Sequence, residues 1–113
     1  MRNVNHGGHF TDVYSMDIQR GRDHGLPTYG VVAEELGLGA VNAFAGFTDD
    51  STINGKLEEL YGNPNQLDLI VGIFAEKPKA NSILGKVGTH IAAKNFERAR
   101  SSDRFWYERK PTD

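Results

Sequence analysis

The densest group of reactive side chains in this sequence lies in residues 17–27, which read D-I-Q-R-G-R-D-H-G-L-P. Two arginines, two aspartates and a histidine stand close together there. A planar arginine fork held beside the N–H groups of a turn suits a carboxylate or a phosphate. The same charges can instead pair with one another and only fix a turn, which is the default interpretation from chemistry alone. Both interpretations stay open at this point.

The backbone of residues 17–27 is expected to form a shaped loop, because the run has no helical or strand periodicity. Gly21 and Gly25 permit backbone angles that other residues resist. Pro27 fixes its own φ and biases Leu26 away from the helical region. Binding residues are often found on such loops.

The order of these residues, continued as T-Y at 28–29, resembles a signature of the animal-type haem peroxidases, the family of myeloperoxidase, thyroid peroxidase and the invertebrate peroxidases. Three further matches follow in the family's order, namely Y-G-N-P-N-Q-L-D-L at 61–69, A-E-K-P at 75–78 and D-R-F-W-Y-E at 103–108. Four ordered motifs are far more specific than one. The resemblance covers residues 12–108 and corresponds to a C-terminal part of the family's catalytic domain.

The resemblance implies haem-pocket roles for two residues of the first motif. Asp17 stands where the family has a partner that accepts a hydrogen bond from the proximal His of the iron, and that contact orients the imidazole. Arg20 matches an arginine that contacts a haem propionate. We assign Arg22 and Asp23 to holding the loop in shape, and His24 has no assigned role.

The resemblance also implies what this chain lacks. The family reduces hydrogen peroxide at a haem iron while oxidising a small electron donor, and the cofactor carries that chemistry. The proximal His, the distal His, Arg and Gln, and the calcium-binding loop all lie upstream of the matching region. None of the four histidines here matches the iron ligand. We therefore expect a part of a peroxidase that binds haem together with the rest of its parent polypeptide and is not catalytic alone.

Composition narrows the remaining function classes. The 113 residues carry a formal net charge of −2, so there is no basic field for nucleic acid. No apolar run approaches the ~20 residues of a membrane span. The absence of cysteine excludes disulfides and thiolate metal sites. No signal peptide is recognisable in this chain, although the resemblance implies a secreted protein.

Two alternatives to a catalytic part remain. The chain could be a peroxidase-derived module that binds partners through exposed helix faces, without catalysis. A small zinc site at His6 and His9 is a weaker idea, because the two glycines between them disfavour an aligning helix and no third ligand is evident.

The expected fold is all-α, with short helices joined by long loops and little or no sheet. We expect a flexible segment at 1–9, the C-terminal portion of an animal haem peroxidase domain at 10–108, and a tail at 109–113. Apolar spacing and capping residues predict helices at about 10–16, 27–36, 51–61 and 87–100. Residues 67–74 suit a buried strand or a short helix, and the resemblance favours the helix. A loop at 75–88 with three lysines is expected to be solvated.

Overall fold

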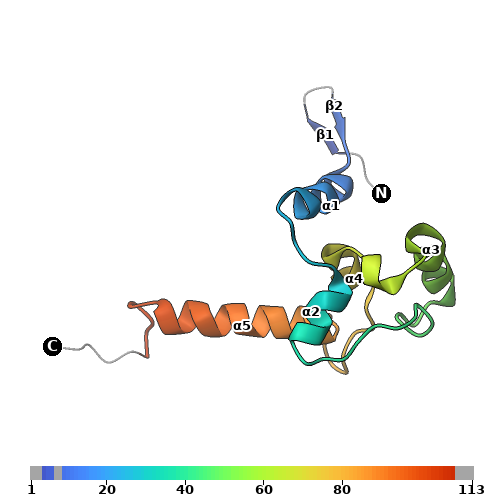
Figure 1. Ribbon diagram of the computed structural model, residues 1–113. Helices are drawn as coiled ribbons and strands as arrows, with labels where there is room; N and C mark the ends of the chain where they lie inside the picture. Colours follow the sequence, from blue (N-terminus) through green and yellow to red (C-terminus); the bar gives the residue numbers. More distant parts are fainter. Residues whose placement is uncertain (1–3, 7–8, 109–113) are drawn as a thin grey trace.

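The chain is mostly helical in the computed structural model, which describes residues 4–6 and 9–108 (Figure 1). The elements are, in order, β1 (Val4–His6), β2 (His9–Thr11), α1 (Val13–Asp23), α2 (Tyr29–Glu35), α3 (Ser51–Tyr61), a 3-10 helix η1 (Pro64–Gln66), α4 (Leu69–Ala75) and α5 (Lys86–Ser102). Short helices joined by long loops agree with the expected all-α class.

A small hairpin precedes the helices. Strands β1 and β2 pair antiparallel, with Val4 opposite Thr11 and His6 opposite His9. The helix expected from Phe10 begins only at Val13. Its start is set by the side chain of Asp12, which accepts hydrogen bonds from the backbone N–H groups of the next turn and so caps the helix.

The prediction of a loop at residues 17–27 is wrong for the first seven of them, because residues 17–23 belong to α1. The helix carries polar pairs along its surface, including Gln19 to Asp23 at 2.7 Å. No residue of α1 is buried, so its hydrophobic periodicity is weak and a search for an apolar stripe misses it. The helix ends at His24, followed by Gly25 with φ of 66°.

Helix α2 begins two residues after the expected start at Pro27, and it ends next to Leu36 as expected. Thr28 occupies its N-cap position directly after Pro27. At the C-terminal end, Gly37 has φ of 69° and donates to Glu34, while Leu38 N donates to the carbonyl of Ala33 at 2.8 Å. This pair of bonds is a Schellman motif, for which a glycine is well suited.

The later helices also agree with the expected positions. Asp50 caps α3, as the acidic residues before it predicted, and Gly62 with φ of 66° follows its end. Residues 67–74 form α4 with its preceding turn, so the helical alternative is confirmed. Helix α5 spans the predicted 87–100 and extends by a residue or two at each end.

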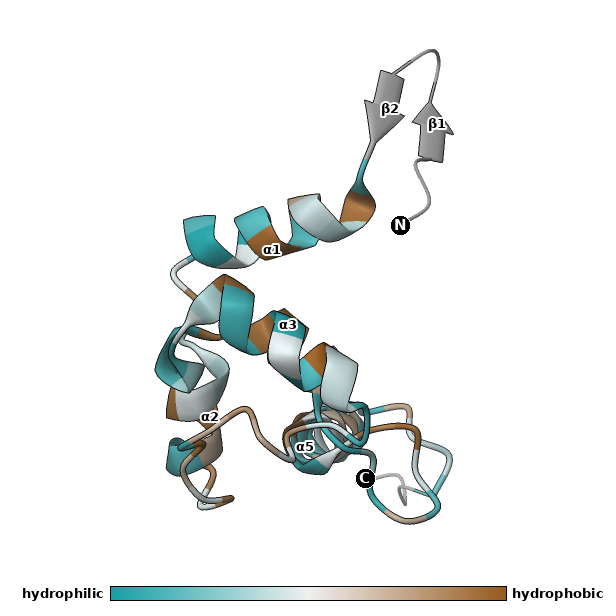
Figure 2. Cartoon of the chain, turned by 90° about the vertical axis from the view of Figure 1, so that its right-hand side faces the viewer, coloured by the Kyte–Doolittle hydropathy of each residue, from teal (hydrophilic) through white to brown (hydrophobic). Residues whose placement is uncertain are grey.

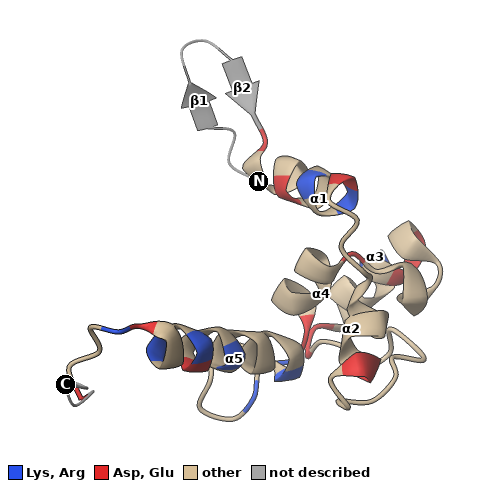
Figure 3. Ribbon diagram, turned by 60° about the vertical axis from the view of Figure 1, so that its left-hand side comes forward, with Lys and Arg blue, Asp and Glu red and all other residues tan. Residues whose placement is uncertain are grey.

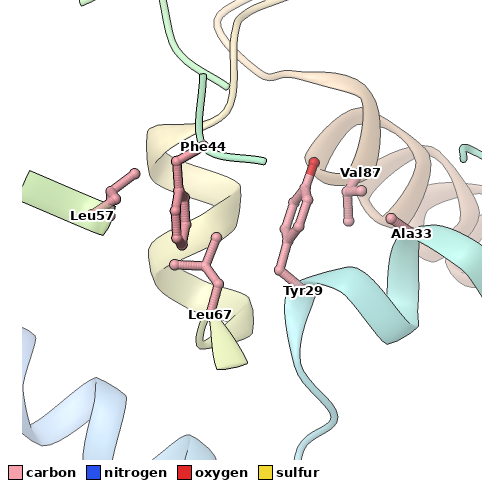
Figure 4. Close-up of a cluster of buried hydrophobic side chains, with 6 residues drawn as sticks. All are labelled: Tyr29, Ala33, Phe44, Leu57, Leu67 and Val87. Carbon is pink, nitrogen blue, oxygen red and sulfur yellow. The ribbon is translucent and has the colours of Figure 1, made fainter. Parts of the chain in front are cut away.

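The core is small and is formed by α2, α3, α5 and the segments between them. Among the residues whose side chains are described, six hydrophobic ones are buried: Tyr29, Ala33, Phe44, Leu57, Leu67 and Val87. Figure 4 shows them in one cluster, with Phe44 supplied by the long loop between α2 and α3. The same loop supplies Phe47, whose ring meets the Tyr29 ring edge-on at 5.1 Å.

The chain is extended compared with a self-contained domain. Its radius of gyration is 17.7 Å, whereas a compact domain of this length has a value of about 13 Å. Helix α5 projects away from the body, and α1 with the hairpin lies on another side (Figure 1). Large apolar side chains stay exposed, among them Phe96 at 78%. Among the described residues, no helix combines the length and apolar character needed to cross a membrane.

Candidate functional site

A cleft of about 330 Å³ lies between α1 and the start of α4. One wall carries polar side chains of α1 and its end, namely Asp17, Arg20 and His24. The remaining lining is largely apolar and includes Ile18, Leu26, Leu69 and Ile70. The cleft therefore combines an apolar interior with a cation and a carboxylate on one wall.

The two residues assigned to the haem face lie together in this cleft and pair with each other. A terminal nitrogen of Arg20 donates to Oδ1 of Asp17 at 2.7 Å, one turn apart on α1. The Arg20 side chain remains 70% exposed and that of Asp17 30% exposed. A guanidinium has five N–H donors, so this pairing leaves most of the fork available to an anion.

Arg22 binds an aspartate that is distant in sequence, rather than one of the two aspartates of its own motif. Its Nε and a terminal nitrogen donate to the two carboxylate oxygens of Asp68 at 3.0 and 2.6 Å. The hydroxyl of Tyr61 donates to the same carboxylate at 2.9 Å. These contacts join the end of α1, the end of α3 and the start of α4. Arg22, which was assigned to holding a loop, therefore lies in a helix and links that helix to Asp68 across the fold.

The electrostatics of this group follow from the contacts. The hydrogen bonds from Arg22 hold the pKa of the Asp68 carboxyl below its usual range, and Tyr61 adds to that effect. Burial, together with the bond to Asp68, raises the pKa of Tyr61 to about 12. The fixed negative charge of Asp68 also raises the pKa of Arg22, so the pair stays ionised.

The other two residues of the first motif have local roles. Asp23 accepts a hydrogen bond from Gln19, and it does not line the cleft. The His24 ring bonds the carbonyl of Arg20 through Nδ1 at 2.8 Å. A carbonyl can only accept, so Nδ1 carries the proton in this contact. That bond ties the ring to the last turn of α1.

A buried acid outside the cleft, Glu76, was not among the predicted site residues. Glu76 is 6% exposed and accepts hydrogen bonds from Tyr29, Val87 N and Gly88 N. The expectation that residues 75–88 are solvated is wrong at this position, because the carboxylate satisfies the first N–H groups of α5. The packing around this carboxylate is close, because a Cβ at Gly85 would collide with the Glu76 side chain.

The histidine pair proposed for zinc lies in the hairpin, and the side chains of His6 and His9 fall outside the described part of the structure. Across the residues whose side chains are described, no group of three or more His, Asp or Glu is placed to hold a metal ion. Helix α1 carries charged residues of both signs, and the far half of α5 is rich in Lys and Arg (Figure 3).

The sequence matches the animal haem peroxidase family over residues 2–113. The chain belongs to the animal haem peroxidase family. Among curated family members, it is 37% identical to peroxidase skpo-1 of Caenorhabditis elegans over 103 residues, which is 89% of this chain and 16% of that protein. The family assignment made from the four motifs is therefore confirmed.

Solved structures support the same assignment. Peroxidase A from Dictyostelium discoideum superposes with a TM-score of 0.84 and 36% identity, covering 89% of this chain and 20% of that chain. A fatty acid alpha-dioxygenase from Oryza sativa superposes with a TM-score of 0.78 at 24% identity, covering 91% of this chain and 18% of that chain, and shows the fold alone. The peroxidase fold elements in this chain thus span about a fifth of the solved relative.

Proposed function

We propose that this chain forms one wall of the haem site of a peroxidase that reduces hydrogen peroxide and oxidises a small donor. The family membership carries the proposal, and the composition of the cleft supports it. Haem has an apolar body and an anionic propionate edge. An apolar cleft with Arg20 on its wall suits both parts of such a group.

In this proposal Arg20 binds a propionate and Asp17 accepts a hydrogen bond from the proximal His. The exposed guanidinium of Arg20 can hold a carboxylate while it keeps its bond to Asp17. Asp17 uses Oδ1 for Arg20, and a second oxygen remains for an imidazole N–H. A carboxylate is a stronger acceptor than an amide, so Asp17 gives the imidazole more imidazolate character.

The iron ligand, the distal residues that handle peroxide and the calcium site are supplied by other parts of the parent polypeptide. When bound, haem provides the redox chemistry of peroxide reduction. The residues of this chain contribute orientation and charge: Arg20 fixes the cofactor's edge, and Asp17 fixes the ring and the proton of the proximal His. Secretion of the parent protein, implied by the family resemblance, remains a prediction.

The reduction potential of the iron tests this role directly. In the full-length, haem-loaded protein, Asp17→Asn is expected to raise the Fe(III)/Fe(II) potential, because an amide stabilises the oxidised iron less well through the imidazole. Asp23→Asn is the matched control: it removes the same charge from the same helix, away from the cleft. Equal potentials in wild type and Asp17→Asn would refute the assignment.

A non-catalytic interaction module is the second candidate. The observation that favours it is the exposed apolar surface at the far end of α5 and after it, with Phe96 at 78%, Phe105 at 83% and Tyr107 at 81% exposed. Large exposed apolar side chains of this kind are typical of surfaces that contact other protein. In a full-length peroxidase, the rest of the polypeptide would also cover this surface, so the exposed side chains do not separate the two candidates. The candidates differ in whether the protein binds haem. The iron potential and the haem spectrum of the full-length protein distinguish them.

A further inference from the structure

Helix α1 is attached to the rest of the chain by few contacts. None of its residues is buried, and α1 lies apart from the hydrophobic core (Figure 2). Near its N-terminal end, the Tyr14 ring packs against Phe74 at 5.6 Å between centroids. Near its C-terminal end, Arg22 binds Asp68 through two hydrogen bonds. The orientation of α1 therefore depends strongly on single side-chain contacts.

The contact at Arg22 is much more directional than an ordinary surface ion pair. Two parallel N–H···O bonds of 3.0 and 2.6 Å fix the plane of the guanidinium against the carboxylate. Asp68 is itself held, because Tyr61 donates to it at 2.9 Å and its side chain is only 16% exposed. A residue separation of 46 between Arg22 and Asp68 makes this a link across the fold.

The same carboxylate belongs to the cleft. Asp68 and Leu69 line the side of the cleft that faces Asp17 and Arg20 on α1. At 3.6 residues per turn, Arg22 lies about 140° around the helix from Asp17. Because two hydrogen bonds hold the planar guanidinium at that angle, they oppose rotation of α1 about its axis as well as movement of α1 away from α4.

We propose that Arg22, Asp68 and Tyr61 form a clamp that positions Asp17 and Arg20 for the haem. The three are positioning residues: they act through α1 and set the width of the cleft and the direction in which Asp17 points. This inference rests on the proposed function for its consequence at the iron, whereas the clamp itself can be tested without haem.

The first test measures the position of α1 in the 113-residue chain. The chain has no cysteine, so spin labels can be placed uniquely by Met16→Cys on α1 and Glu59→Cys on α3, both exposed. Pulsed electron paramagnetic resonance then gives the distribution of distances between them. We expect one narrow distribution in the labelled chain and a broader or shifted one with Asp68→Asn added.

Two further variants make this test specific. Arg22→Lys keeps the charge but cannot form the fork, so it should broaden the distribution as well. Lys94→Gln removes an exposed ion pair of 3.0 Å on α5 and should leave the distribution unchanged. Helix content by circular dichroism shows that each variant is folded. A folded Asp68→Asn chain with the parent's distribution would overturn the clamp.

The second test reads the consequence at the iron of the full-length, haem-loaded protein. Arg22→Lys should shift the Fe(III)/Fe(II) potential in the same direction as Asp17→Asn, because a mobile α1 weakens the bond to the proximal His. A shift in Asp17→Asn without one in Arg22→Lys overturns the positioning role and leaves the proposed function intact. If Asp17→Asn itself has no effect, the proposed function fails, and the spin-label distances still decide the clamp.

Discussion

The carboxylate of Glu76 accepts a hydrogen bond from the hydroxyl of Tyr29 at 2.7 Å inside the core. The two residues are 47 positions apart, on α2 and on the turn that leads to α5. The same carboxylate receives Val87 N at 3.1 Å and Gly88 N at 2.8 Å. One buried side chain therefore joins α2 to the N-terminus of α5, and burial together with this bond raises the pKa of Tyr29.

Glu76→Gln is expected to destabilise the chain substantially. Three donors point at the two oxygens, so an amide NH2 meets a backbone N–H in either orientation. A lost hydrogen bond to a charged group costs about 1.5–3 kcal/mol, and the expected loss lies in that range. Denaturant unfolding measures it. The exposed Glu59→Gln is the control, and equal stability of the two variants would contradict the role of Glu76.

Gly72 marks a second close contact with Tyr29. A Cβ at Gly72 of α4 would overlap the Tyr29 ring, whereas a Cβ at Gly55 of α3 would meet nothing within 4 Å. Gly72→Ala should therefore destabilise the chain by about 1–3 kcal/mol through overpacking. Gly55→Ala should instead stabilise it by about 0.5–1 kcal/mol, because alanine favours the helix interior. Thermal unfolding of both variants compares them, and the same sign in both would be inconsistent with this packing.

The contacts of Tyr29 with Glu76 and Gly72 are features of the fold that the sequence does not predict. The ends of α2 and α3 could be predicted because their signals are local: Gly37, Asp50 and Gly62 act on backbone groups within a turn. The roles of Glu76 and Asp68 could not be predicted from the sequence, because Tyr29 and Arg22, with which they pair, are far away along the chain. An acid in a lysine-rich turn gives no sign that it is buried until the fold brings α2 and α5 to it.

The continuation of α1 over residues 17–23 was missed for a different physical reason. Residues Tyr14, Ile18 and Gly21 of α1 do follow helical spacing and face α4 or the cleft. Tyr14 is partly exposed and Gly21 has no side chain, so the apolar stripe is narrow. The glycine also suggested a loop. The family resemblance pointed to Asp17 and Arg20, which both line the cleft, and their haem roles stay predictions; it said nothing of the ion pair between them.

The Tyr61–Asp68 contact predicts how stability changes at alkaline pH. The pKa of Tyr61 is about 12 in the folded chain, above the ordinary value of 10.0 that applies when the chain is unfolded. A raised folded pKa gives a contribution to stability that is fully present below pH 10 and is lost as the pH rises through 12. The free energy of unfolding should therefore fall less steeply in Tyr61→Phe than in wild type over this window. Parallel pH profiles of the two proteins would exclude the effect.

The stability of the chain at acidic pH tests the contribution of Asp68. Its pKa is lowered in the folded chain, chiefly by the bonds from Arg22, so its contribution is present above its usual value of 3.8 and is lost as the pH falls through the folded pKa. Asp68→Asn should remove this part of the acid sensitivity. Denaturant unfolding at pH 6 and at successively lower pH measures it, with Asp23→Asn as the control. An unchanged acid profile in Asp68→Asn would show that the pair with Arg22 does not stabilise the fold.

The final prediction concerns haem binding by the 113 residues alone. Because none of the four histidines matches the iron ligand of the family, haemin added to the purified chain should keep a broad absorption band like that of free haemin. Peroxide turnover should not exceed that of haemin without protein. A sharp Soret band with turnover that is lost in Asp17→Ala would contradict this expectation. In that case the chain would recruit an iron ligand of its own, and Asp17 would act on that ligand.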